Sequence, residues 1–150
     1  MNKPDERAWG CPMAKTKFPH DNLYTRLKSS PNGVGVFAIR DIPIGTRLFV
    51  GEIGETVQIL VSDVEKVQDT ELRRMYYDFC PVIKSHFIAP ADFNQMTMGW
   101  YINHSHDPNV KVDEFLQFAT SRPVGLGEEL TADYLTYSEH ASAFVRGWSR

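Results

Sequence analysis

The chain has 150 residues, of which 42% are hydrophobic and 23% are charged, and this size and balance indicate one globular domain. No apolar run reaches the length of a membrane span, and the polar opening MNKPDERAWG lacks the features of a signal peptide. We therefore expect a cytoplasmic protein without a membrane partner. The two cysteines, Cys11 and Cys80, are too few for a four-cysteine zinc site.

The formal net charge of −3 is unevenly distributed along the chain. Residues 1–28 hold six basic and three acidic side chains, whereas residues 101–139 hold two basic and seven acidic ones. An acidic C-terminal region argues against direct nucleic-acid binding, which depends on cations that neutralise phosphates. It suits a cationic ligand, although scattered solvated acids would give the same composition.

The first part of the chain predicts an irregular arm followed by strands. Prolines at positions 4, 12 and 19 interrupt residues 1–23. Residues 34–39 read as a strand buried on both faces, DIPIG as a tight connection, and residues 46–53 and 55–61 as two further strands.

One helical region, residues 62–79, follows these strands. Ser62 and Glu65 fit a capping box at its start. The apolar face is interrupted at Asp69 and Thr70, so the region forms one helix or two short ones. HFIA predicts a short strand, residues 96–102 a turn of helix, NVKVD and FLQFATS a strand pair, and GLGEEL a turn into a strand. The chain is thus predicted to be strand-rich with a helical insertion at about 60–80.

Three segments carry residues suited to chemistry. The first is PNGVGVFAIRDI, in which Gly33 and Gly35 flank Val34 just before a strand. Glycines let a backbone approach a ligand closely. A turn leading into a strand would show the same pattern, and no helix or further glycine follows to complete a dinucleotide-binding fingerprint.

The second segment, WYINHSHDPNV, concentrates polar side chains after an apolar run. Asn103 can both donate and accept, which suits the edge of an adenine or another backbone segment, and His104 can ligate, relay protons or brace the loop. A metal site would need His104 and His106, with Asp107 as a further ligand, but Pro108 disfavours the strand that would align them. We predict no metal, and a polar turn remains the alternative.

The third segment, GLGEELTADYLTY, ends in an aspartate followed by Tyr134. Its hydroxyl is either a positioned hydrogen-bonding group or the satisfied hydroxyl of a packed tyrosine.

Taken in order, the three segments resemble the SET domain family of protein-lysine methyltransferases. That family carries a G-x-G strand entry, then R-F-I-N-H-S-C-x-P-N, then G-E-E-L-T-x-D-Y. The resemblance covers residues 24–137, between an arm at 1–23 and a C-terminal flank at 138–150. It implies a mainly β fold of several short curved sheets, with a C-terminal pseudoknot that brings the last two segments together around one ligand.

The resemblance also implies a function and its residues. The expected activity is transfer of a methyl group from S-adenosylmethionine (AdoMet) to the side-chain amine of lysine in a protein, for instance a basic, histone-like one. Tyr134 would be the catalytic residue of the methyl-transfer pore. The cofactor contacts that the resemblance implies fall on Gly33, Val34, Gly35, Asn103, His104 and Tyr134.

Several positions depart from the family pattern. Ala132 replaces an aromatic that limits the number of methyl groups in the family, so we expect room in the channel for di- or trimethylation. Tyr137 and Trp148 are candidates to line the substrate channel, although an amphipathic C-terminal helix would also explain them. The departures leave open a SET-like module that binds AdoMet or a basic peptide without turnover, and an unrelated β-rich module.

Overall fold

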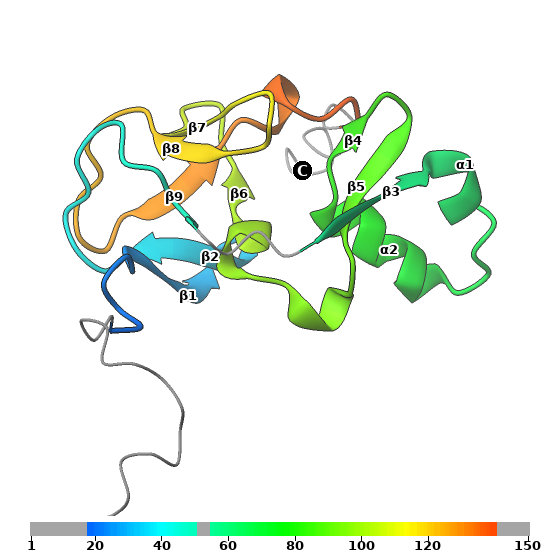
Figure 1. The fold of residues 1–150 in the computed structure, drawn as a ribbon, viewed down its shortest axis with the longest axis horizontal. Helices are drawn as coiled ribbons and strands as arrows, with labels where there is room; N and C mark the ends of the chain where they lie inside the picture. The colour runs from blue at the N-terminus through cyan, green and yellow to red at the C-terminus, as the bar shows by residue number, and fades with distance from the viewer. Residues whose placement is uncertain (1–17, 51–54, 141–150) are drawn as a thin grey trace, which may run out of the picture.

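The structure, a computed structural model, describes residues 18–50 and 55–140 (Figure 1). Its first element is an antiparallel hairpin of β1, Thr25–Ser30, and β2, Gly33–Ala38. Gly33 adopts a φ of +104° at the start of β2, which glycine tolerates without strain. The sequence predicts β2 but gives no sign of β1, because TRLKSS is largely polar and exposed and shows no apolar alternation.

The hairpin extends into a six-stranded sheet whose main path runs β1-β2-β9-β7-β8. It contains β7, Val110–Val112, β8, Phe118–Thr120, and β9, Glu129–Ala132, all in segments where the sequence predicts strands. A two-residue strand, β6, Asn103–His104, pairs with β9 in parallel. This pairing places the second and third sequence segments side by side, which the expected pseudoknot requires.

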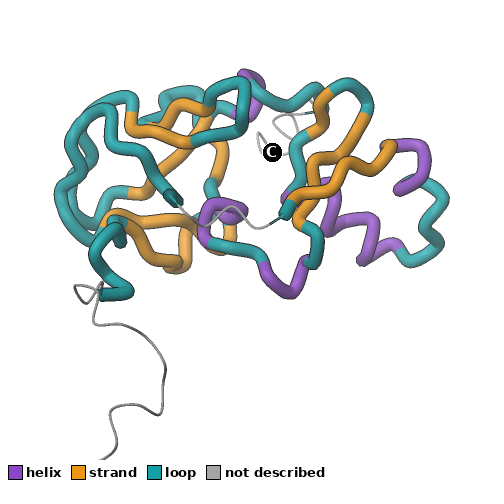
Figure 2. Tube along the Cα trace, viewed as in Figure 1, coloured by secondary structure: helices purple, strands orange, loops and turns teal. Residues whose placement is uncertain are grey.

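The insertion forms the right half of the view in Figure 1 and carries its own sheet, with strand order β3-β5-β4. The strands are β3, Thr56–Leu60, β4, Val82–Ile83, and β5, His86–Pro90. Two helices accompany them, α1, Val61–Val64, and α2, Thr70–Phe79. Figure 2 shows α1 at the outer end of the small sheet, while α2 runs from the outside toward the middle of the molecule.

Two local predictions, one in the insertion and one just before it, are wrong. The predicted capping box of Ser62 and Glu65 does not form, and α1 has no side-chain cap. Asp69 instead caps α2 and accepts hydrogen bonds from Glu71 N and Leu72 N. Of the strand predicted over 46–53, the described residues 46–50 contribute only an isolated bridge from Arg47 to Ala119. The φ of +56° at Phe49 ends extended pairing there.

Each half has a separate hydrophobic core. Val36, Ile42, Val110, Val124 and Leu130 are among the buried residues of the larger sheet. The insertion buries a second cluster, Val64, Cys80, Val82, Phe87 and Ala89. Two short 3₁₀ helices, η1, Phe93–Gln95, and η2, Met98–Tyr101, connect the halves, and η2 lies where the sequence predicts a helical turn. No helix in the described ranges is long and apolar enough to cross a membrane.

The chain after β9 ties the two halves together. A third 3₁₀ helix, η3, Tyr134–Thr136, leads to Ser138 and Glu139, which bond to the edge of the insertion. Val82 N donates to Ser138 Oγ over 3.0 Å, and Glu139 N donates to Val82 O over 2.8 Å. The Glu139 carboxylate accepts from the backbone N–H groups of Lys84 and Ser85 in the turn between β4 and β5.

Candidate active site

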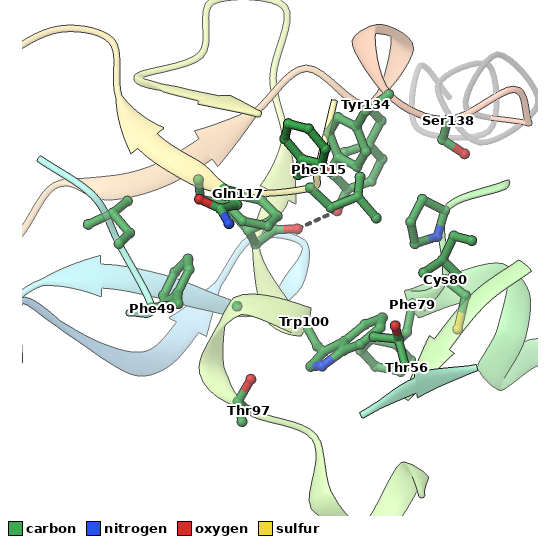
Figure 3. A pocket seen from close by; sticks show the side chains of 18 of the residues that line it. Phe49, Thr56, Phe79, Cys80, Thr97, Trp100, Phe115, Gln117, Tyr134 and Ser138 are labelled. Atoms are coloured by element: carbon green, nitrogen blue, oxygen red, sulfur yellow. Dashed lines mark hydrogen bonds between the residues drawn. The ribbon is translucent and has the colours of Figure 1, made fainter. Parts of the chain in front are cut away.

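Two cavities meet at Tyr134. The first, which we call the aromatic cavity, has a volume of about 280 Å³ and lies between the insertion, η2 and the β7–β8 hairpin (Figure 3). Its wall includes eight aromatic residues, among them Phe49, Phe79, Trp100, Phe118, Tyr134 and Tyr137.

The second, which we call the glycine-turn cavity, has a volume of about 320 Å³ and includes Asn32, Val34, Tyr101 and Asn103 in its wall. This volume lies within the range of small-molecule sites. Five residues line both cavities: Asp78, Phe79, Trp100, Ile102 and Tyr134.

Tyr134 is held firmly at this junction. Its hydroxyl donates to the carbonyl oxygen of Ile102, as the dashed line in Figure 3 shows. Burial, and secondarily the charge of Glu129, raise the pKa of the Tyr134 phenol well above its ordinary value of 10.0. The phenol therefore stays protonated at physiological pH, so it can donate or accept a hydrogen bond but does not serve as a base.

The glycine turn is packed against the side chain of Glu129. A Cβ on Gly35 would lie 2.3 Å from Glu129 Oε1 and 3.1 Å from Asn103 Nδ2, so a larger residue there would displace both. Val34 between the glycines is 46% exposed and lines the cavity. The close neighbours of Gly35 are side chains rather than a ligand, and neither Gly33 nor Gly35 is among the lining residues of the two cavities, so their cofactor contact stays a prediction.

Asn103 fastens this turn to the second segment. It is 7% exposed, and its Nδ2 donates to Ser30 Oγ over 3.2 Å, to Val34 O over 3.1 Å and to Glu129 Oε1 over 2.8 Å. Asn103 therefore holds the backbone of the hairpin turn against β9 while lining the glycine-turn cavity.

His104 lies behind Tyr134 and is not among the residues that line either cavity. Its Nδ1 accepts the backbone N–H of Tyr134 over 3.1 Å and lies 3.7 Å from Asp133 Oδ1. The ring stands edge-on to His106 at 4.6 Å between centroids. Burial, and then the neighbouring His106, lower the pKa of His104 below 6.5.

The side-chain ligand atoms of His104, His106 and Asp133 lie within 4.8 Å of one another. Asp133, rather than Asp107, which the disfavoured metal interpretation had considered, is therefore the carboxylate beside the two histidines. Because Tyr134 N–H already uses the lone pair of His104 Nδ1, the neutral ring carries its proton on Nε2. We assign no metal to this group.

Comparison with known proteins agrees with this arrangement. The model of the SET domain family matches residues 33–135. The chain belongs to the SET domain family. No curated protein sequence matches it.

Among solved structures, 206 chains match. One is the crystal structure of a candidate histone methyltransferase of Plasmodium falciparum, with 20% sequence identity and a TM-score of 0.48. The similarity covers 74% of this chain and 92% of that one.

The SET fold corrects one expectation about the channel. Ala132 is fully buried in the core of the larger sheet and is not among the lining residues of either cavity. On β9 it follows Leu130 on the buried face, while Glu129 and Thr131 alternate with them at intermediate burial. Its small side chain therefore does not widen the aromatic cavity directly, and the reasoning from Ala132 to di- or trimethylation loses its basis.

The other two channel candidates differ in outcome. Tyr137 lines the aromatic cavity, and burial followed by the neighbouring Tyr134 raises the pKa of its phenol well above 10.0. Its ring centroid lies 5.9 Å from that of Tyr134, at an edge-on angle of 71°. Trp148 lies outside the described residues, so its place in a SET channel stays a prediction.

Sequence reasoning missed several residues at the junction of the two cavities. Asp78, Phe79 and Trp100 line both cavities, and Asp78 is the charged residue among the five shared ones. Phe79 and Trp100 looked like core residues of a helix and of an apolar run. The carboxylate within the aromatic run MYYDFC was the available signal for Asp78, since it lies near the end of a helix beside partly buried rings.

Proposed function

We propose that this SET domain catalyses AdoMet-dependent N-methylation of lysine side chains in proteins. The observation that carries the proposal is the meeting of two cavities at Tyr134, one lined by the glycine turn and one by aromatic rings. A reaction that joins two substrates through a narrow contact needs such a junction, with each substrate held on its own side.

The glycine-turn cavity suits AdoMet. Asn32, Val34 and Asn103 would bind its polar groups, and the carboxylate of Asp78 fits a ligand that carries positive charge. Trp100 and Tyr101 add aromatic surface that tolerates a sulfonium cation. When bound, AdoMet would supply a methyl group activated by its sulfonium.

The aromatic cavity suits the side chain of a lysine. Its rings would contact the aliphatic stem, while the amine would reach the junction near Tyr134. A free lysine has a pKa of about 10.4 and must lose a proton before it can attack. An apolar wall favours the neutral amine, and the proton would leave to water before the transfer.

Tyr134 would hold the attacking amine in line. Because its hydroxyl proton is engaged by the carbonyl of Ile102, the oxygen lone pairs are left to accept a hydrogen bond from the amine. The lysine nitrogen would then form its bond to the methyl carbon as the carbon–sulfur bond breaks. Positioning and exclusion of water would provide most of the acceleration.

A basic protein, such as a histone-like one, is the proposed partner. Seven acidic residues lie between positions 101 and 139, and Asp113 and Glu114 are exposed on the β7–β8 hairpin beside the cavity residue Phe115. These charges would attract a cationic segment to the mouth of the aromatic cavity.

Calorimetric titration with AdoMet and with its demethylated product tests the cofactor site. Both should bind, and Asn103→Ala should weaken both because the hairpin turn loses its anchor to β9. Binding followed by methylation of lysine peptides would support the enzyme. Binding without transfer to any lysine peptide or protein would favour the alternative, a module that binds AdoMet without turnover. Absence of AdoMet binding would contradict the enzyme and leave only a module that binds a basic peptide.

A further inference from the structure

We propose that His104 is a positioning residue, which fixes Tyr134 by accepting its backbone N–H and can do so only as a neutral ring. The effect on catalysis rests on the proposed methyl transfer, whereas the hydrogen bond itself does not. The resemblance implied a cofactor contact for His104; in the structure its side chain faces the backbone of Tyr134.

The hydrogen bonds of Tyr134 form a two-point attachment to one short segment. Its backbone N–H donates to His104 Nδ1, and its hydroxyl donates to the carbonyl of Ile102, two residues earlier. Both the backbone and the hydroxyl of Tyr134 are therefore hydrogen-bonded to residues 102–104. Loss of the backbone bond would let the phenol pivot about its hydroxyl contact and leave the line of transfer.

The side chain of His104 is buried, and only one of its two ring nitrogens has a hydrogen-bond partner among those given above. The side chain is 9% exposed, and its Nε2 has no hydrogen-bond partner. With Nδ1 accepting, Nε2 must carry the proton, so a buried donor is left unsatisfied at a cost in stability. The arrangement makes sense if the Nδ1 acceptor provides something that this cost offsets.

Protonation would break this attachment. An imidazolium carries a hydrogen on both nitrogens, so Nδ1–H would face Tyr134 N–H, two donors at 3.1 Å. Asp133, 3.7 Å from Nδ1, would then attract the cation. Asp133 and the backbone carbonyl of Ala132 favour the charged ring, but burial and the adjacent His106 ring oppose charging and lower the pKa overall. The Tyr134 ring also lies against His104, at 5.2 Å between centroids.

Two substitutions separate the accepting atom from the ring. In His104→Asn the amide oxygen can occupy the place of Nδ1 and does not titrate, whereas in His104→Gln the amide reaches the place of Nε2 and Nδ1 is lost. At about pH 8 we expect His104→Gln to lower kcat by about ten- to a hundredfold with little change in the KM for AdoMet. His104→Asn should restore kcat to within about threefold of wild type.

The pH profile provides a readout that a merely structural role would not move. The ratio of wild-type to His104→Asn kcat should stay constant above neutrality and fall in acid, because only wild type loses its acceptor; titration of the substrate lysine cancels in the ratio. A constant ratio down to the acid limit of folding, or folded His104→Asn as slow as His104→Gln, would overturn the proposal. His86→Asn is the matched control, because His86 bonds to Lys84 O in the insertion. The ratio of wild-type to His86→Asn kcat should not change with pH.

The hydrogen bond can be tested without any activity. Nitrogen-15 spectra of the histidine rings in the full chain should show His104 unprotonated at Nδ1 and protonated at Nε2 at neutral pH. A protonated Nδ1 in the neutral ring would overturn the proposal. If wild type transfers no methyl group, the proposed function fails, and the spectrum still decides whether His104 holds Tyr134.

Discussion

At the scale of single residues, the site depends on atoms that sequence patterns could place only in part. The order of the motifs pointed to Tyr134, Asn103 and the glycine turn, because each of them is part of a segment that matches a motif of the family. It could not show that Tyr134 N–H bonds to His104, since the two residues lie 30 positions apart and meet only through the β6–β9 pairing. Ala132 was assigned to the channel from its position in the family motif. Its alternation with Leu130 along the strand would have placed it in the core instead.

Tyr134→Phe should abolish most methyl transfer while leaving AdoMet binding nearly unchanged. The substitution removes the bond to Ile102 and the oxygen that would accept from the amine, but keeps the ring in both cavities. We expect kcat to fall by about a hundredfold or more, measured with a lysine peptide, and the calorimetric Kd for AdoMet to stay within about threefold. Full retained activity would remove the role assigned to this hydroxyl.

His104 should also make stability depend on pH. Its pKa in the folded protein is lowered from the ordinary 6.5, mainly by burial. Below about pH 6.5 the unfolded chain therefore binds a proton that the folded chain resists, so the free energy of unfolding falls as pH drops toward the folded pKa, while above 6.5 this contribution is constant. Urea unfolding across this range should show His104→Asn losing less stability in acid than wild type; parallel losses would contradict the assignment.

At the scale of elements, strands with apolar β-formers were predictable and polar ones were not. The sequence located β2, β3, β5, β7, β8 and β9, because GVGVFA, TVQIL, HFIA, VKV, FAT and ELTA carry apolar or β-branched residues. It missed β1, whose polar residues pair only because the β2 hairpin closes on them. The helical region was located, and its division into two helices near Asp69 was one of the two alternatives. Only the cap was misjudged, because α1 has no side-chain cap, whereas Asp69 caps α2.

Gly35→Ala tests the packing of the glycine turn on β9. The added Cβ would lie 2.3 Å from Glu129 Oε1, and Glu129 cannot move away without giving up its bond from Asn103. We expect the free energy of unfolding to fall by about 1–3 kcal/mol and AdoMet binding to weaken. Gly125→Ala is the matched control, because its Cβ would meet only Glu128 Oε2 at an ordinary 3.9 Å. Equal effects of the two substitutions would contradict the close approach.

Glu139→Ala tests the attachment of the C-terminal segment to the insertion. The carboxylate accepts from Lys84 N and Ser85 N, whose φ values of 49° and 61° mark a turn that needs support. Thermal unfolding should show a loss of about 1 kcal/mol, and peptide methylation should weaken because Tyr137 lies on the same segment. Glu114→Ala, an exposed acid on the β7–β8 hairpin, should change stability little. Unchanged stability of Glu139→Ala would show that the attachment is not needed.

At the scale of the whole molecule, the proposed site forms where two separately cored halves meet. The larger sheet supplies the glycine turn and Tyr134, and the insertion supplies Asp78 and Phe79, so neither half could hold both substrates alone. Residues that line both cavities come from three distant parts of the chain, which explains why the motifs revealed the cofactor side more fully than the substrate side.

Asp78→Asn provides the last test, because Asp78 is the charged residue that both cavities share. Removing its charge should raise the KM for a basic peptide by about threefold at low ionic strength and by less in high salt, since an exposed charge is screened. Asp63→Asn removes the same charge from α1, where Asp63 pairs with Lys66 and lines neither cavity. If Asp78 acts locally, initial-rate measurements will show a raised KM for Asp78→Asn and not for Asp63→Asn. If net acidity alone attracts the substrate, both substitutions will raise the KM equally, and that result would contradict a local role of Asp78.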